Sequence, residues 1–271
     1  MGPVHAEEVS VRTAAAAGGA RHGQRAGHQC ARTVVVIPTY NEAKNLPRLV
    51  KALETLELPD LWILVVDDNS PDGTGQIAEE LRTSYPKIEI IHRAGKLGLG
   101  TAYVEGFQRA LEMGAEYVVQ MDADLSHEPG RIPLMLEAAQ DADVVVGSRY
   151  IEGGELDPGW GRLRVLLSGW ANLYARTILA AEQRDMTGGF RCWSRSAVER
   201  LDFATINSSG YAIQIELAYR CQRLGLRVQE IPIHFYERDG GVSKMSSRVM
   251  LEAAWRVWQL RLRPWRPADR P

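Results

Sequence analysis

Two aspartates separated by one residue, Asp122 and Asp124, directly follow the apolar run at 117–121. Such a run predicts a buried strand, and the carboxyl ends of parallel strands are where open α/β sheets bind ligands. Mg²⁺ is commonly held by one or two carboxylates together with phosphate oxygens of a substrate. The pair therefore predicts a site where a metal ion meets a diphosphate. The alternative is a solvated turn, because Asp-x-Asp also occurs by chance.

Two further polar clusters follow predicted strands. The first is PTYNE at 38–42 and the second is DDNSPDG at 67–73. Each has a structural alternative, since Asn41 could cap a helix that Glu42 favours through its dipole, and the second cluster reads as an Asp/Pro/Gly turn. With the aspartate pair they have one joint explanation. Tyr40 and Glu42 would border a base and ribose, and Asp68 would accept hydrogen bonds from that nucleoside.

The elements that must position these residues alternate between short apolar strands and longer amphipathic segments. The predicted strands are 33–37, 61–66, 87–92, 116–121 and 143–146, and the predicted helices are 43–56, 74–84, 99–113 and 130–140. The alternation is typical of βαβ units and predicts an α/β fold, with a Rossmann-like, mostly parallel sheet covered by helices on both faces. Right-handed crossovers then place the strand-end loops on one rim, which is the predicted site.

After Arg149 the strict alternation stops. Helices are predicted at 162–180, 211–224 and 246–262, and a strand at 227–235. The loop 236–243 contains Gly240 and Gly241, which a mobile lid would use. We expect a disordered extension at 1–31, one domain at 32–244, a C-terminal amphipathic helix at 245–262 and a flexible tail at 263–271.

The composition argues against several classes of protein. A formal charge of −2 over 271 residues is unlike a nucleic-acid-binding domain, which carries a strongly basic field. The three cysteines, Cys30, Cys192 and Cys221, have no metal-ligand spacing, which favours core thiols in a reducing compartment. No stretch approaches the roughly 18 apolar residues of a membrane span. The N-terminal residues also lack the sequence of charged, then apolar, then small residues that is typical of a secretory signal.

Two common nucleotide-binding motifs are missing as well. A dinucleotide site requires G-x-G-x-x-G straight after the first strand. Here Gly98 and Gly100 follow the third predicted strand, and Tyr103 stands where the third glycine belongs. Lys96 follows a glycine, as in a P-loop, but neither the upstream glycine nor the Ser or Thr of that motif is present.

An ordered set of motifs extends from about residue 34 to residue 244. It consists of PTYNE at 38–42, VDDNSPDGT at 66–74, KLGLGTAY at 96–103, MDADLSH at 121–127, GSRY at 147–150, TGGFR at 187–191 and SK at 243–244. This set resembles family-2 glycosyltransferases of the GT-A fold, and within them the dolichyl-phosphate mannosyltransferases, called polyprenol monophosphomannose synthases in bacteria. The resemblance implies that 32–244 is a GT-A catalytic domain.

The resemblance implies transfer of mannose from GDP-mannose to a polyprenyl (dolichyl-type) monophosphate, with inversion at the anomeric carbon and Mg²⁺ or Mn²⁺ as cofactor. The implied nucleotide-sugar-binding residues are Pro38, Tyr40, Glu42, Val66, Asp68, Asp122, Ala123, Asp124, Arg149, Arg238 and Lys244. The implied metal ligands are Asp122, Asp124 and Ser126; some relatives have Gln at the Ser126 position, and a bridging water is the alternative there. The implied acceptor-phosphate residues are Arg149, Arg164 and Ser168, and the implied catalytic residues are Asp124 and Arg149.

The acceptor sets the chemistry that the protein must supply. A phosphate monoester has a second pKa of about 6, so at neutral pH it is largely a dianion and already nucleophilic. Transfer to a hydroxyl would instead need a positioned base, and Asp185 could serve as one. We expect Asp185 to be structural, because a basic pocket without an obligatory base fits a lipid phosphate.

Two helical segments carry apolar stripes. They consist of Leu163, Leu166, Leu167, Trp170, Leu173 and Tyr174 in the first, and Leu251, Trp255, Trp258 and Leu262 in the second. An apolar stripe is usually core, and we expect core for the first, whereas core and membrane contact are equally open for the second. Residues 245–271 hold six arginines against Glu252 and Asp269, which suits an anionic membrane surface or a membrane-embedded partner subunit. We expect a peripheral protein on the cytoplasmic face of a membrane.

Two other functions remain open. One is a related polyprenyl-phosphate glucosyltransferase that uses UDP-glucose, since a few contacts around Tyr40 and Asp68 decide the base. The other is a non-catalytic scaffold that binds nucleotide sugars. The Asp124→Ala change distinguishes an enzyme from such a scaffold. In an enzyme it should abolish transfer yet leave the fold intact, if Asp124 is an exposed strand-end acid.

Overall fold

The computed structural model describes residues 31–206, 208, 210, 212–237, 247–263 and 265, without the side chains of 247–252. Cys30, Arg238 and Lys244 lie outside the described residues. So do residues 1–30 of the predicted extension, residues 238–243 of the predicted lid loop and most of the predicted tail. The predicted sheet, its helices and the aspartate pair all lie inside them.

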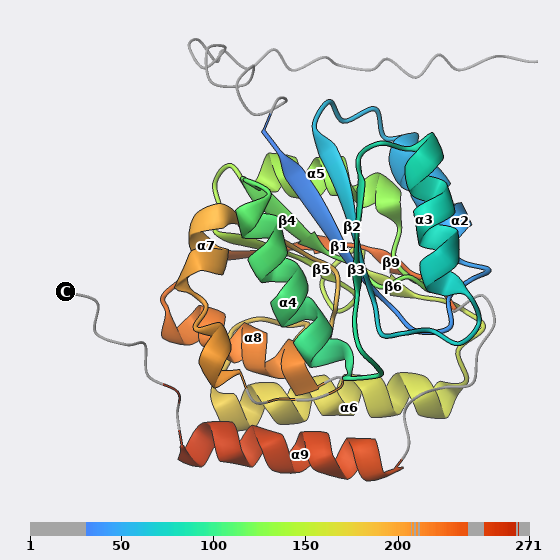
Figure 1. The fold of residues 1–271 in the computed structure, drawn as a ribbon. Helices are drawn as coiled ribbons and strands as arrows, with labels where there is room; N and C mark the ends of the chain where they lie inside the picture. The colour runs from blue at the N-terminus through green and yellow to red at the C-terminus, as the bar shows by residue number, and fades with distance from the viewer. Residues whose placement is uncertain are drawn as a thin grey trace, which may run out of the picture.

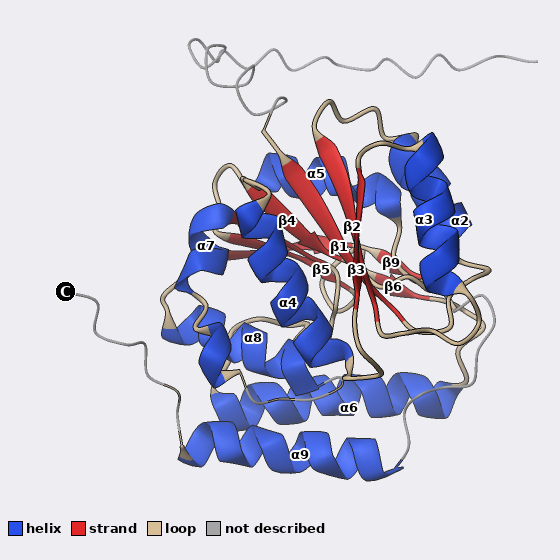
Figure 2. Ribbon diagram, in the orientation of Figure 1, coloured by secondary structure: helices blue, strands red, loops and turns tan. Residues whose placement is uncertain are grey.

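A seven-stranded sheet forms the centre of the described residues, with the order β3-β2-β1-β4-β7-β5-β8 (Figures 1 and 2). The strands are β1 (Thr33–Thr39), β2 (Leu61–Asp67), β3 (Ile88–His92), β4 (Tyr117–Gln120), β5 (Val144–Ser148), β7 (Arg191–Ser194) and β8 (Val228–Pro232). Neighbouring strands are parallel except at β7, which is antiparallel to both β4 and β5. The prediction of an α/β fold with a mostly parallel sheet is confirmed.

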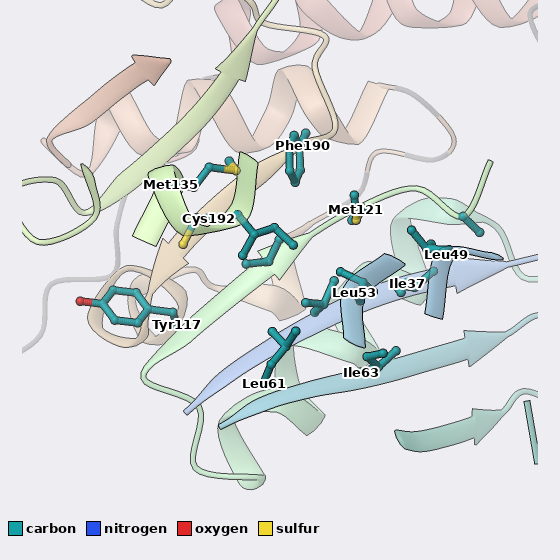
Figure 3. Packing of buried hydrophobic residues seen from close by; sticks show 14 of the residues in the cluster. Ile37, Leu49, Leu53, Leu61, Ile63, Tyr117, Met121, Met135, Phe190 and Cys192 are labelled. Atoms are coloured by element: carbon teal, nitrogen blue, oxygen red, sulfur yellow. The ribbon is translucent and has the colours of Figure 1, made fainter. Parts of the chain in front are cut away.

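Helices cover both faces of this sheet, because alternate strand residues point to opposite faces and both sets are apolar. They are α2 (Leu46–Glu54), α3 (Thr74–Ser84), α4 (Leu99–Glu112), α5 (Ile132–Ala138), α7 (Arg195–Arg200) and α8 (Ala212–Arg223). Ile37 and Ile63 belong to the buried cluster under α2, α3 and α5, where Figure 3 shows Leu49 and Leu53 close to them. The cluster of the opposite face lies under α4, α7 and α8 and includes Val36.

Several elements differ from the prediction. The strand expected at 227–235 is divided: β8 ends at Pro232, and β9 (His234–Phe235) pairs with β6 (Glu155–Leu156) in a separate two-stranded sheet. The sequence did not predict β6, β7 or α7. A charged residue, Arg191, opens β7, yet its side chain is fully buried, so the polarity that usually marks a loop is misleading here.

Two long helices, α6 (Arg162–Leu179) and α9 (Ser247–Leu262), lie side by side along one end of the molecule (Figure 1). The Tyr174 hydroxyl donates a hydrogen bond to the Ala254 carbonyl at 3.2 Å, and Leu179 and Val257 are buried in a cluster that both helices share. Among the described residues, no helix combines the length and apolar character that crossing a membrane requires.

The outer surfaces of these helices are apolar and exposed. The large exposed side chains are Leu163, Val165, Leu166, Leu167, Trp170 and Leu173 of α6 and Trp255, Trp258 and Leu262 of α9. The expectation that the α6 stripe is core is therefore wrong for all of its members but Tyr174, which is half-buried. The sequence pattern identified an apolar face correctly but could not show whether another element covers it.

Candidate active site

The ends of β1, β2 and β4 meet at one edge of the sheet, as predicted. Thr39 pairs with Asp67 in the parallel register of β1 and β2, and its hydroxyl donates to the Asp67 carboxylate at 2.8 Å. On the other side of β1, the Met121 amide donates to the Val36 carbonyl at 3.2 Å. This edge therefore gathers the three polar clusters that follow these strands.

At the end of β4, both aspartates are held by neighbouring polar groups. Asp122 accepts a hydrogen bond from the Tyr103 hydroxyl at 2.8 Å, and its amide donates to Nδ1 of His127 at 3.2 Å. Asp124 is only 7% exposed and accepts from the Ser126 hydroxyl at 2.5 Å and from the Ser126 amide at 3.2 Å. The pair is part of a fixed loop, which differs from a solvated turn and from the expectation that Asp124 is exposed.

The first polar cluster is not a helix cap. Asn41 lies in the left-handed region at φ 60°, and α2 begins only at Leu46, so the capping interpretation of Asn41 is wrong. Lys96 lies 4.0 Å from the Tyr40 ring centroid, and the Glu42 amide donates to the Thr74 hydroxyl at 2.9 Å. Tyr40 and Glu42 thus lie next to segments that follow β2 and β3, in the place predicted for a nucleoside.

Asp68 links the residues that follow β2 to those that follow β3. Its carboxylate is buried, pairs with the Arg93 guanidinium and accepts from the Gly98 amide at 2.9 Å. Each oxygen can accept more than one hydrogen bond, so the carboxylate can also serve a ligand. Val66 behaves differently, because its side chain is fully buried against α4 and only its backbone is near the edge.

Arg149, which follows β5, is locked in a buried ion pair with Asp185. Nε and Nη2 of Arg149 donate to the two Asp185 oxygens at 2.8 and 2.7 Å, and Nη2 also donates to Thr187 at 2.8 Å. Burial acts to raise the pKa of Asp185, but the charge and hydrogen bonds of Arg149 outweigh it and hold that pKa below its ordinary value. A carboxylate so paired is a weak base, which supports the structural role expected for Asp185.

The ion pair leaves one end of the Arg149 guanidinium for another partner. The described residues provide no hydrogen-bond acceptor for Nη1, whose two N–H groups could bind an anion. Burial acts to lower the pKa of Arg149, whereas the charge of Asp185, and further that of Asp122, raises it. Arg149 is therefore a fixed cation within the electrostatic reach of the aspartate pair.

Ser168 and Arg164 come from α6 and are linked to Arg149 through aromatic side chains. The Tyr150 hydroxyl donates to Ser168 at 2.6 Å, which brings α6 against the residue that follows Arg149. Arg164, one turn earlier, stacks on Trp160 at 3.6 Å and pairs with Glu237 at 3.1 Å, with 40% of its side chain exposed. Ser168 is thus linked to Arg149 through Tyr150, and Arg164 through the rings of Trp160 and Phe235, although Arg164 carries a carboxylate partner.

The residues present fit a metal that is held jointly with a substrate. The described residues contain no group of three His, Cys, Asp or Glu side chains that could hold a metal ion by themselves. Two carboxylates with phosphate oxygens completing the shell are, however, a common arrangement for Mg²⁺. A donor set of this kind predicts weak metal binding to the free protein and tighter binding together with a nucleoside diphosphate.

Several residues of the site were not singled out from the sequence. Tyr103, Arg93 and His127 hold the carboxylates or the loop of the three clusters. The Phe235 ring lies 5.1 Å from the Arg149 guanidinium and meets the His127 ring edge-on at 5.5 Å. Tyr103 and His127 were visible only as members of motifs. Nothing in the local sequence marks Arg93 or Phe235, because their partners are distant along the chain.

Comparison with known proteins places the chain. The model of the family described as "Glycosyl transferase family 2" matches residues 34–202. The chain belongs to this family. It is therefore a glycosyltransferase, as the motifs predicted. A "Polyprenol monophosphomannose synthase" of Mycolicibacterium smegmatis is 44% identical over 234 residues, which cover 85% of this chain and 88% of that protein. An "Undecaprenyl-phosphate mannosyltransferase" of Micrococcus luteus is 41% identical over 234 residues, covering 86% and 96%.

Solved structures of glucosyl-3-phosphoglycerate synthase from Mycobacterium tuberculosis resemble this glycosyltransferase. The complex with phosphoglyceric acid has a TM-score of 0.63 at 20% identity, covering 88% of this chain and 86% of that chain. The complex with Mn²⁺, UDP-glucose and phosphoglyceric acid has a TM-score of 0.61 at 20% identity, with the same coverage. At such identity the likeness concerns the fold alone, and it confirms the GT-A prediction.

Proposed function

We propose that this glycosyltransferase transfers mannose from GDP-mannose to a polyprenyl monophosphate, with inversion and with Mg²⁺ or Mn²⁺. The names of both curated relatives support the sugar and the lipid acceptor. The observation that carries the proposal is that one short segment, 187–189, links Arg149 to the aspartate pair. Thr187 accepts from Arg149 at 2.8 Å, and a Cβ built on Gly189 would lie 3.6 Å from an Asp122 oxygen.

On the donor side, the nucleoside diphosphate would lie along the edge formed by β1, β2 and β4. Tyr40, Glu42 and Asp68 would contact the nucleoside, with Pro38, Val66 and Ala123 contributing backbone. The chemistry that Mg²⁺ or Mn²⁺ supplies when held by Asp122 and Asp124 is neutralisation of charge on the departing diphosphate. Arg238 and Lys244 remain predicted phosphate contacts, since they lie outside the described residues.

On the acceptor side, the lipid phosphate would meet Nη1 of Arg149, with Ser168 and Arg164 beside it. The phosphate dianion attacks the anomeric carbon without losing a proton, so no side chain needs to act as a base. Asp185 instead orients the Arg149 guanidinium through two parallel hydrogen bonds, the geometry in which Arg binds a carboxylate most firmly. Arg149 would then present a fixed charge to both phosphates.

The exposed surfaces of α6 and α9 fit a lipid acceptor. Trp170 stacks on Tyr174, and the Tyr174 hydroxyl bonds the Ala254 carbonyl next to Trp255, so apolar side chains of the two helices are neighbours. Large exposed apolar patches mark interaction sites, and the exposed Arg162, Arg261 and Arg263 favour an anionic lipid surface. We propose that this face lies on the cytoplasmic surface of a membrane, with α6 delivering the lipid phosphate to Arg149.

The test is a transfer assay with purified protein, Mn²⁺, a polyprenyl monophosphate and either radiolabelled GDP-mannose or radiolabelled UDP-glucose. We expect label from GDP-mannose in the lipid fraction. NMR of the product should show the anomeric configuration opposite to that of the mannose in GDP-mannose. Glucose transfer without mannose transfer would replace the donor assignment with the UDP-glucose alternative. Retention of configuration would overturn direct attack by the lipid phosphate. If binding to vesicles required a second protein, a membrane subunit would replace the lipid surface.

A further inference from the structure

Each carboxylate of the aspartate pair has one oxygen bound by a hydroxyl of the chain. The Tyr103 hydroxyl lies 2.8 Å from Oδ1 of Asp122, and the Ser126 hydroxyl lies 2.5 Å from Oδ1 of Asp124. The two hydroxyls come from different elements, since Tyr103 belongs to α4 and Ser126 to the loop after β4. A hydroxyl bound to one carboxylate oxygen therefore occurs twice, once at Asp122 and once at Asp124.

The hydroxyls are the donors in both contacts. An ionised carboxylate can only accept hydrogen bonds, so the proton must belong to the hydroxyl. Both contacts are charge-assisted, which makes them stronger than hydrogen bonds between neutral groups.

Both hydroxyls are held rigidly. Tyr103 is fully buried, with its ring centroid 6.0 Å from that of Phe107 on the same helix. Ser126 is also fully buried, and its carbonyl accepts from the Tyr236 amide at 3.0 Å. Rotation of a carboxylate about χ2 is otherwise soft, so a fixed donor on one oxygen sets the plane of the whole group.

We propose that Tyr103 and Ser126 are positioning residues, each of which orients one carboxylate of the aspartate pair toward a metal–diphosphate. In this assignment Ser126 acts through Asp124, in contrast to direct or water-bridged ligation by its hydroxyl. Partners that orient metal ligands typically account for 10–100-fold in metal affinity. The assignment rests on the proposed function, because it requires a metal that binds together with a nucleotide.

The test measures Mn²⁺ binding in the presence of GDP, from the electron paramagnetic resonance signal of free Mn²⁺. We expect Tyr103→Phe and Ser126→Ala each to weaken this binding by about 10–100-fold. GDP binding measured in EDTA should stay within about twofold of wild type, because neither hydroxyl contacts the nucleoside in this assignment. Tyr117→Phe is the matched control, since it removes a hydroxyl from a largely buried tyrosine at the opposite end of β4 and should leave both affinities unchanged.

A double-mutant cycle separates positioning from ligation. If Ser126 acts through Asp124, Ser126→Ala should cost little further Mn²⁺ affinity in an Asp124→Asn background, whereas an additive loss would overturn that part of the proposal. If GDP tightens Mn²⁺ binding by the wild-type protein and both single variants bind Mn²⁺ within twofold of wild type, the positioning roles are overturned and the proposed function stands. A wild-type protein whose Mn²⁺ affinity GDP does not change would overturn both. An equal loss in Tyr117→Phe would overturn the role of Tyr103.

Discussion

The sheet edge at the ends of β1, β2 and β4, which is the proposed donor edge, and the α6–α9 end of the molecule are built in opposite ways. At the donor edge, charged side chains such as Asp68 and Asp124 are almost fully buried and bound by partners within the protein. At the α6–α9 end, large apolar side chains such as Leu166 and Trp255 are more than 60% exposed. Each region inverts the usual rule that charge lies outside and apolar surface lies inside.

Under the proposed function, the difference reflects what each half of the reaction requires. A departing diphosphate needs charges held still before it arrives, because preorganised groups need no rearrangement as the bond breaks. A lipid acceptor needs an apolar surface outside the protein, beside a polar site for its phosphate. Arg149 lies between the two regions, bound to Asp185 on one side and linked through Tyr150 and Ser168 to α6.

The largest expected effect comes from breaking the buried pair that joins the regions. Asp185→Asn leaves Arg149 without its counter-charge at a site where Asp185 is fully buried, and removing one member of such a pair typically costs about 3–5 kcal/mol of unfolding free energy. Urea unfolding measures the loss. Glu112→Gln is the control, because the Arg109–Glu112 pair is exposed and should contribute less than about 1 kcal/mol. Equal losses in the two variants would show that burial at the junction carries no special stability.

The second effect concerns activity at the donor edge. Asp124→Asn removes a charge from the proposed metal site, and metal stabilisation of several kcal/mol corresponds to a fall in kcat of about 10²–10³-fold. Asn is a cleaner change than Ala here, because the buried Ser126 hydroxyl and amide would keep an acceptor. Steady-state transfer rates and a thermal melt check both expectations. An active Asp124→Asn protein would contradict a catalytic role for the pair.

A smaller effect is expected at the exposed α6 surface. Leu166→Ser should weaken binding to anionic phospholipid vesicles about tenfold, which is the cost of withdrawing one Leu side chain from an apolar phase. Its unfolding free energy should change by less than about 0.5 kcal/mol, because the side chain is 70% exposed. Leu134→Ser on α5, where Leu134 is 47% exposed, is the matched control and should not affect vesicle sedimentation. Equal binding by both variants would mean that the α6–α9 face does not contact lipid.

The same two regions mark how far sequence reasoning reaches. The ends of β1, β2 and β4 could be predicted because each strand is a local apolar run, and parallel topology then brings their polar residues together. The contacts that hold those residues could not, since Asp68 pairs with Arg93 and Tyr103 with Asp122 across long stretches of chain. Local patterns contain no information on such partners.

At the α6–α9 end, the prediction of an apolar face on α6 was correct, but the prediction that this face is buried in the core was wrong. Periodicity shows which side of a helix is apolar, but the element that would cover that side belongs to the tertiary structure. The antiparallel β7 was missed for a related reason. Arg191 is fully buried, and its guanidinium donates to the Gln214 carbonyl at 2.9 Å, so a charged residue occupies a core strand.

The smallest effect is a pH dependence that isolates the junction between the regions. Because the pKa of Asp185 lies below its ordinary value of 3.8 in the folded protein, its stabilising contribution is complete above about pH 4 and is lost as the pH falls through the folded value. The difference in unfolding free energy between wild type and Asp185→Asn should therefore be constant from pH 8 to pH 5 and shrink only in stronger acid. Taking the difference cancels other carboxylates with lowered pKa values, such as Asp60 and Asp143, which titrate equally in both proteins. A difference that instead grew as the pH fell from 7 to 5 would mean that Asp185 takes up a proton near neutrality in the folded protein, and Asp185 would then again be a possible base for a hydroxyl acceptor.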